Sequence, residues 1–374
     1  MNLNKGNNGK KREKKFDGKR LNAQIEYMPD GTQKAEAYLK AIQQADAAQD
    51  HYWRMLFRYG YACEVTFHDD PPKAMPYAAE FSAIYEENPD VFPKDSGAEA
   101  YLMITQIAID PIVSLPQIPF SQWENLMERY LSLIKRYNEG LRTYWSQYCQ
   151  FYQYVDKEKA FAGFQKFWKT GRDGLSDCRA CERSIAVQMC LMMDDPGAAD
   201  MYAAPMEQGK LRFCSSTPQR YWRSYLEYYL DKGDLKKAEP RANALYRKTR
   251  GEKTDLSYYG AILRCFAFTD LDRGAALLEK QFPLTAGMWD KKLVYDFYKG
   301  AWCFCQRLAK QRDTVSLAFP EKDFPLWDES GVYKTSELAE WFYSQASGIA
   351  EKFDLRNGSK CFSENLKTAG KWLG

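Results

Sequence analysis

Histidine is almost absent from this chain, in which His51 and His68 are the only two among 374 residues. Most enzymes that use histidine as a general base or proton shuttle therefore lose their usual catalyst. The sequence also has no phosphate-binding P-loop, no Gly-rich dinucleotide turn, and no Ser-His-Asp or His-Glu-x-x-His arrangement. These absences favour a protein that is not an enzyme.

Long apolar runs are missing as well. No stretch of 18 apolar residues is present, and the first residues lack the apolar segment of a secretory signal. The 10 cysteines are unevenly spaced over the chain, unlike a disulfide framework. We therefore expect reduced thiols, a cytoplasmic location and no membrane partner.

Positive charge is concentrated at one end of the sequence. Residues 1–20 carry eight Lys or Arg against two acidic residues, while the whole chain has a net charge of +3, so residues 21–374 sum to −3. A mildly acidic body disfavours nucleic acid as a partner. Because residues 1–20 contain three glycines and almost nothing apolar, we expect them to form a disordered basic tail.

Apolar residues recur at three- and four-residue steps from about residue 33 onward. This spacing is typical of amphipathic helices, whereas alternating β-branched runs are scarce. We therefore predict an all-α protein. The first three helices are expected around residues 37–45, 53–64 and 71–81, and the others over about 97–109, 121–138, 140–154, 157–168, 179–193, 197–208, 218–231, 235–249, 256–268, 271–281, 289–311 and 335–353.

A shared pattern recurs through the middle of the chain: an aromatic-rich helix, an acidic turn, and a helix with a small residue in its first turns. The turns begin at Asp156, Asp195, Asp234 and Asp272, and the small residues are Ala160, Ala199, Ala238 and Ala276. Spacings of 39, 39 and 38 residues predict a right-handed tetratricopeptide-like superhelix of helical hairpins with a period of about 39. We expect this array to span residues 33–311, with Asp70–Ala74 as an earlier member.

The last part of the chain, residues 312–374, has a different character. Arg312–Gly331 is irregular, and its aromatic residues should fold back onto the last hairpins, since leaving them in water would cost several kcal/mol at about 25 cal/mol per Å². An amphipathic helix follows, and Asn357-Gly358 suits a left-handed turn. We therefore expect residues 312–374 to form an irregular segment and C-terminal capping helices.

The most specific residues are three cysteines. Asp177 is a suitable N-cap, which would place Cys178 and Cys181 on one face of a first helical turn. The Asp195-Pro196-Gly197 turn should return the chain, so Cys214 is expected beside the other two. Three interpretations remain open: packing of apolar thiols, a zinc site completed by Asp177, Cys190 or water, or a redox role helped by a thiol pKa lowered at a helix N-terminus.

Aromatic and charged residues alternate on the first helices of the hairpins between about Leu141 and Phe268. Tyrosine offers contact area and a hydrogen-bonding tip at low entropic cost. We therefore expect a partner protein or peptide to bind the concave face of the array. The candidate partner-binding residues are Arg142, Tyr144, Arg220, Arg223 and Tyr259.

Several motifs occur in a fixed order: Asp177-Cys-x-x-Cys181, Leu211-x-x-Cys214 with Pro218 four residues on, and Phe353-Asp-x-Arg-Asn-Gly358. Together they resemble a family of bacterial tetratricopeptide-like proteins of largely unassigned function, some linked to toxin or defence loci. The resemblance covers about residues 33–366 and implies a helical array in a bacterial cytosol, without an activity.

Two functions follow from these observations. The first is a non-catalytic scaffold that binds a protein or peptide on its concave face and needs no cofactor. The alternative is a zinc-binding or redox-sensing protein or enzyme that uses Cys178, Cys181 and Cys214.

Overall fold

The computed structural model describes residues 16–92, 94–214, 217–319 and 324–373. It is all-helical, with 74% of residues in helices, which confirms the predicted all-α class. Two short strands form the only sheet in the described ranges, and they pair antiparallel with Thr314 opposite Lys334. Within the same ranges, no helix combines the length and apolar character needed to cross a bilayer.

The chain divides into two compact units, Met1–Ala108 and Ile109–Gly374. This boundary falls inside the range 33–311 that the sequence predicts to be one array. Asp110-Pro111 follows it directly and starts a short 3-10 helix, and the extended Leu115–Pro119 segment comes next. Prolines at these positions prevent a regular hairpin, which explains why the helical pattern is interrupted here.

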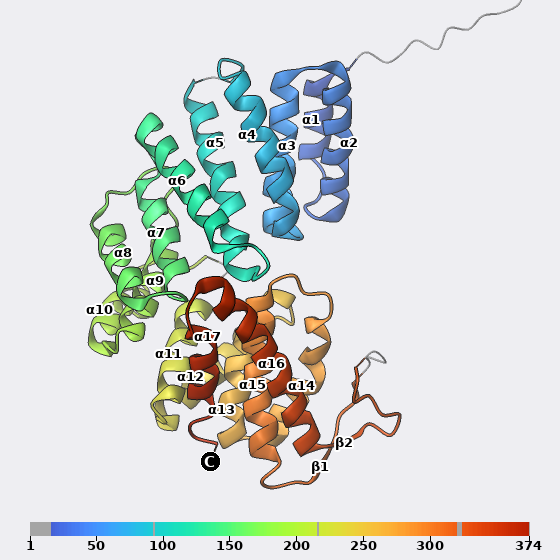
Figure 1. Ribbon diagram of the computed structural model, residues 1–374, viewed down its shortest axis with the longest axis vertical. Helices are drawn as coiled ribbons and strands as arrows, with labels where there is room; N and C mark the ends of the chain where they lie inside the picture. Colours follow the sequence, from blue (N-terminus) through green and yellow to red (C-terminus); the bar gives the residue numbers. More distant parts are fainter. Residues whose placement is uncertain (1–15, 93, 215–216, 320–323, 374) are drawn as a thin grey trace, which may run out of the picture. The chain divides into compact units, whose positions relative to one another are not determined.

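The first unit is a bundle of helices that pack in sequence order. The helices are α1 (Gly18–Glu26), α2 (Thr32–Ala48), α3 (His51–His68), a 3-10 turn (Pro71–Lys73), α4 (Ala74–Glu87) and α5 (Lys94–Ile109), which crosses into the second unit (Figure 1). Ala74 is fully buried, as expected for the small residue of an early hairpin.

Helix α1 corrects one prediction. Asp17 caps it by accepting a hydrogen bond from the backbone of Arg20 at 3.0 Å, and Gly18 is buried under the Trp53 ring. Residues 16–20 are thus ordered by a cap and a packing contact that composition alone does not reveal. The rest of the expected tail, residues 1–15, lies outside the described residues.

The second unit contains the hairpins that the repeat predicts. Its helices are α6 (Phe120–Tyr137), α7 (Leu141–Tyr152), α8 (Lys157–Lys169), α9 (Arg179–Met192), α10 (Pro196–Glu207), α11 (Gln219–Asp231), α12 (Leu235–Lys248), α13 (Leu256–Thr269), α14 (Leu271–Gln281) and α15 (Lys291–Leu308), with 3-10 turns at Asp110–Ser114, Lys253–Asp255 and Phe282–Thr285. The two helices of each hairpin pack against each other. In addition, α9 packs against α11, α11 against α13, and α13 against α15.

The acidic turns are helix N-caps. The side chains of Asp156, Asp195, Asp234 and Asp270 each accept a hydrogen bond from the backbone N–H three residues on. Four residues after each cap, a small residue is buried in the hairpin crossing: Ala160, Ala199, Ala238 and Gly274. The acidic turn and the buried small residue are thus parts of one local structure.

The fourth turn differs from the prediction. Its cap is Asp270 and its small residue is Gly274, over which the Phe304 ring lies, whereas Ala276 is exposed. The caps are therefore 39, 39 and 36 residues apart, so the spacing is not constant. Asp272 also lies in this turn. The prediction chose Asp272 because its distance from Asp234 is close to the spacing of the earlier turns, whereas the residue that caps the helix is Asp270.

After α15 the chain folds back on the array. Strands β1 (Thr314–Ser316) and β2 (Val332–Lys334) lead into α16 (Thr335–Asn357) and α17 (Cys361–Ala369). Phe319 and Phe324 are buried against Phe282, which confirms that the aromatics of the irregular segment cover the last hairpins.

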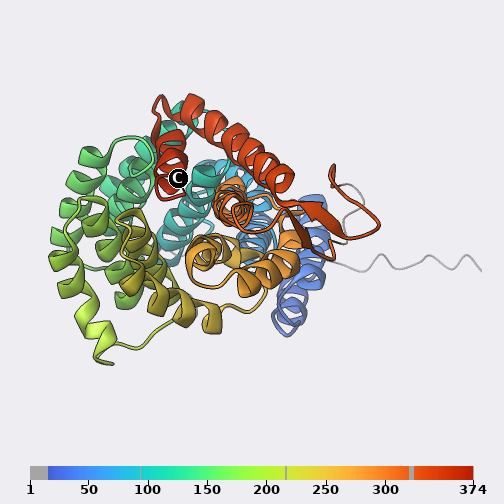
Figure 2. The same ribbon diagram turned by 90° about the horizontal axis from the view of Figure 1, so that it is seen from below.

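Helix α16 packs along α15, and α17 packs against α11, α15 and α16 (Figure 2). Gly358 between them has φ +61°, as expected for the Asn-Gly turn.

Candidate functional site

Cys178 and Cys181 stand at the start of α9. Cys178 is the N-cap, and its Sγ accepts a hydrogen bond from the backbone N–H of Cys181 at 3.4 Å. The predicted cap at Asp177 is therefore wrong by one residue, because the backbone of Cys178 is still extended, with ψ 149°. The two cysteines nevertheless occupy the first turn, as expected.

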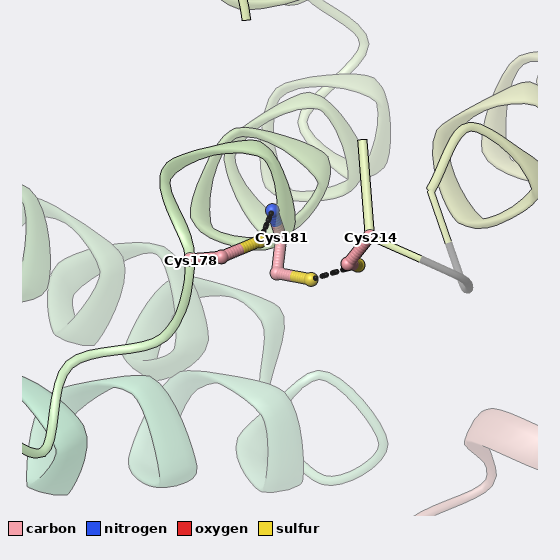
Figure 3. A group of neighbouring side chains, drawn as sticks. All are labelled: Cys178, Cys181 and Cys214. Atoms are coloured by element: carbon pink, nitrogen blue, oxygen red, sulfur yellow. Dashed lines mark hydrogen bonds between the residues drawn. The ribbon is translucent and has the colours of Figure 1, made fainter. Parts of the chain in front are cut away.

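Cys214 returns to this helix end. Asp195 caps α10, which packs against α9, and the segment after Glu207 carries the chain back to the start of α9 (Figure 3). The Sγ atoms of Cys181 and Cys214 are 3.1 Å apart, and the three sulfurs lie within 4.8 Å of one another. The predicted cluster is confirmed.

The three thiols differ in exposure. Cys181 is buried, Cys214 is half-buried and Cys178 is exposed, so the cluster meets solvent on one side. Burial raises the pKa of the Cys181 thiol to about 12, and its hydrogen bond with Cys214 adds to the shift. The lowered pKa expected for a redox thiol is therefore wrong at Cys181, because desolvation outweighs the helix N-terminus.

Thr217 completes the surroundings of the sulfurs. Its Oγ1 lies 3.3 Å from the Sγ of Cys214 and 3.6 Å from that of Cys181, and the residue is buried. Among the described residues, no further cysteine, histidine or carboxylate joins this group, so Asp177 and Cys190 are not its fourth member.

Two of the five expected partner-binding residues are inside the protein, so that part of the prediction is wrong. Arg142 is 6% exposed and makes a two-pronged ion pair with Glu182, with Nε to Oε1 at 2.8 Å and Nη2 to Oε2 at 3.0 Å. Tyr259 is 2% exposed, and its hydroxyl accepts a hydrogen bond from the backbone of Gly251 at 2.8 Å. Alternation of charge and aromatics does not tell which helix face is buried.

The other three residues are half-buried. Arg220 and Arg223 share α11, where Arg220 donates to Oε1 of Gln150 at 3.2 Å and Arg223 donates to Oδ2 of Asp296 at 2.7 Å. Tyr144 lies on α7 and packs edge to face on Trp145. Of this set, Arg223 lines a cavity of the second unit.

That cavity lies in the second unit and has a volume of about 780 Å³. We call it the inner cavity. Side chains from α9, α11, α15 and α17 line it, and they include Arg223, Glu227, Lys292, Asp296 and Lys299. Its size is in the range of ligand pockets.

The lysines of α15 were missed by sequence reasoning. They belong to the run Lys292–Lys299, where charges interrupt an otherwise aromatic and aliphatic helix. Charged residues at otherwise apolar positions of a helix indicate a polar site inside the protein. This pattern is the sequence signal that could have identified the lysines.

The charged side chains of the inner cavity form a network. Asp296 contacts Arg223 at 2.7 Å, Lys299 at 3.5 Å and Lys292 at 3.9 Å, and Glu227 contacts Arg223 at 3.2 Å. Burial pushes the pKa of Asp296 upward, but the surrounding cations outweigh it and hold that pKa below its ordinary value. Three cations therefore face two carboxylates, which leaves this network one positive charge in excess.

A second group of potential ligands occurs in the first unit, where Asp30, Glu64 and His68 come together. Lys34 already forms ion pairs with Asp30 at 2.8 Å and Glu64 at 3.5 Å. This group is a partly buried ion-pair network in which the lysine supplies the cation.

Comparisons of the chain with protein-family models, curated proteins and solved structures found no match.

Proposed function

We propose that the protein is a non-catalytic, tetratricopeptide-like scaffold that binds a protein or peptide through the inner side of its second unit. The helices form a right-handed superhelix in this proposal. Stacked helical hairpins commonly present such a surface to extended partners. The observation that carries the proposal is the inner cavity, which opens among charged side chains of α11 and α15.

The binding surface is narrower than the concave face predicted from sequence. Helix α17 packs against α11 and α15, and in this proposal the C-terminal segment therefore covers part of that face. The inner cavity remains, and the charged network on its wall, in which three cations face two carboxylates, suits an acidic side chain or a carboxylate of the partner. Lys292 is the best candidate contact, because its ion pair with Asp296 at 3.9 Å is too long for a hydrogen bond.

The proposal is tested by selecting ligands from a displayed library of random peptides and measuring their affinity by calorimetry. We expect acidic residues to be enriched, and Lys292→Gln to weaken binding about tenfold, which corresponds to about 1.4 kcal/mol. Lys236→Gln, on the exposed face of α12, is the matched control and should bind like the parent protein.

A photo-reactive residue at Ser224, which lines the inner cavity, should crosslink to the selected peptide, whereas the same residue at Lys236 should not. Peptides that bind Lys292→Gln and the parent protein equally would place the site elsewhere. Arg223 is unsuitable for this test, because its loss would remove the cation that lies closest to both Asp296 and Glu227.

A further inference from the structure

The three sulfurs of Cys178, Cys181 and Cys214 converge from two segments that are more than thirty residues apart in sequence. Packing alone does not require this, since an apolar pocket at a helix end can be filled by any small aliphatic side chain. The three side chains instead offer the same chemically soft donor atom, sulfur, and the three sulfurs lie together at one point. That is the arrangement that soft and borderline metal ions select.

We propose that Cys178, Cys181 and Cys214 form a zinc site with three thiolate ligands and a fourth position that faces solvent. Tetrahedral zinc with Zn–S bonds of about 2.3 Å places its sulfurs about 3.8 Å apart. The sulfurs of Cys181 and Cys214 are 3.1 Å apart and all three lie within 4.8 Å of one another, so rotamer adjustments suffice to reach that geometry. A Cys-x-x-Cys pair followed by a distant cysteine is also the usual order of ligands in zinc sites.

The surroundings suit an anionic metal–thiolate group. Three thiol protons leave when the metal binds, so zinc with three thiolates carries one negative charge. The backbone N–H of Cys181 points at the Sγ of Cys178, and the N-terminus of α9 adds a partial positive charge. The hydroxyl of Thr217 lies within reach of two sulfurs and can donate to a thiolate.

The fourth ligand comes from outside this group. Among the described residues, no other cysteine, histidine or carboxylate reaches the three sulfurs, and Cys178 is exposed to solvent. In this proposal water, which reaches the exposed side of the cluster at Cys178, is the fourth ligand. Bound zinc would tie the segment before α11 to the start of α9, and α11 carries Arg223 to the inner cavity. The site does not depend on any partner binding there.

The experiment uses the full chain, purified without chelators. Metal content is measured by plasma mass spectrometry, zinc affinity by competition with a chromophoric chelator, and ligand identity from the thiolate-to-metal and ligand-field bands after replacement by Co²⁺. We expect about one zinc per chain, thiolate bands from Co²⁺, and a lower melting temperature after zinc is removed.

Cys178→Ser is the informative variant, because this residue is exposed and serine is a good N-cap, so the fold should persist. It should weaken zinc binding by at least about a hundredfold. Cys190→Ser, which changes a buried cysteine of the same helix outside the cluster, is the matched control and should retain zinc.

Two results would overturn the proposal. One is a chain with intact thiols that holds no zinc and binds it no better than Cys178→Ser. The other is a Cys181–Cys214 disulfide, seen by peptide mass mapping, in protein isolated from a reducing cytosol. Cys214→Ser provides a second check, because it removes the ligand from the other segment and should also abolish the Co²⁺ thiolate bands.

Discussion

At the residue scale, some buried glycines and charged residues are required because of one particular neighbour that they contact. Gly260 of α13 and Gly300 of α15 meet where the two helices cross, and a Cβ at Gly300 would overlap the backbone of Gly260. The crossing is therefore a direct backbone contact, which explains why neither position can carry a side chain.

Gly300→Ala should destabilise the protein by about 3 kcal/mol or more, because the added methyl group must push α13 and α15 apart. Gly348→Ala is the matched control, since Gly348 lies within α16 and a Cβ there would meet no atom within 4 Å. That variant should gain about 0.5–1 kcal/mol from the greater helix propensity of alanine. Urea unfolding followed by circular dichroism measures both. Equal stabilities of the two variants would show that the helices do not cross this closely.

Arg142 is the second residue with a testable role. Its guanidinium is held by Glu182 and by the carbonyl of Phe167 at 3.0 Å. Arg142→Ala leaves the buried Glu182 carboxylate with Arg172 as its remaining cation, so we expect a loss of about 3 kcal/mol. Arg212→Ala, at an exposed residue, should change stability by less than about 0.5 kcal/mol. If Arg142→Ala unfolds at the same urea concentration as the parent protein, the buried ion pair does not stabilise the fold. Arg142 would then again be a candidate partner-binding residue.

At the element scale, α17 joins the end of the chain to the second unit by packing against α11, α15 and α16. It is held by a hydrogen bond from Tyr295 to the carbonyl of Phe362 at 2.8 Å and from Lys299 to Asn365 at 2.7 Å. Phe362 and Leu366 are buried beneath it. The helix is thus part of the core of the second unit and not a loose cap.

Truncation after Gly358 should therefore destabilise the second unit by roughly 5 kcal/mol, from the apolar burial that α17 provides. Lys299 and Tyr295 would also lose their partners. The melting temperature measures the loss. Removal of residues 1–15 shortens the chain by a similar length, and we expect it to leave the melting temperature unchanged, because that stretch is basic and nearly devoid of apolar residues. If both truncations melt like the full chain, α17 does not stabilise the fold as its contacts indicate.

At the scale of the whole molecule, most helices could be predicted from sequence. Apolar spacing located α7 to α14 to within a few residues, and the N-cap aspartates marked where α8, α10 and α12 begin. These are local features, since a cap needs only its own first turn and a helical stripe needs only its own periodicity. For the same reason the return of Cys214 to Cys181 could be predicted, because it follows from one hairpin.

The sequence by itself thus determined the all-α class, the hairpins and the gathering of three cysteines. Tertiary structure alone decided that Arg142 and Tyr259 are buried, that Gly274 and not Ala276 fills the fourth crossing, and that α17 packs against α11 and α15. It also assembled the inner cavity from Arg223 and from Lys292 and Asp296, which lie about seventy residues further along the chain. The physical reason is that period and capping specify how a segment folds, whereas contacts between distant segments decide which of its faces meets the core and which meets water.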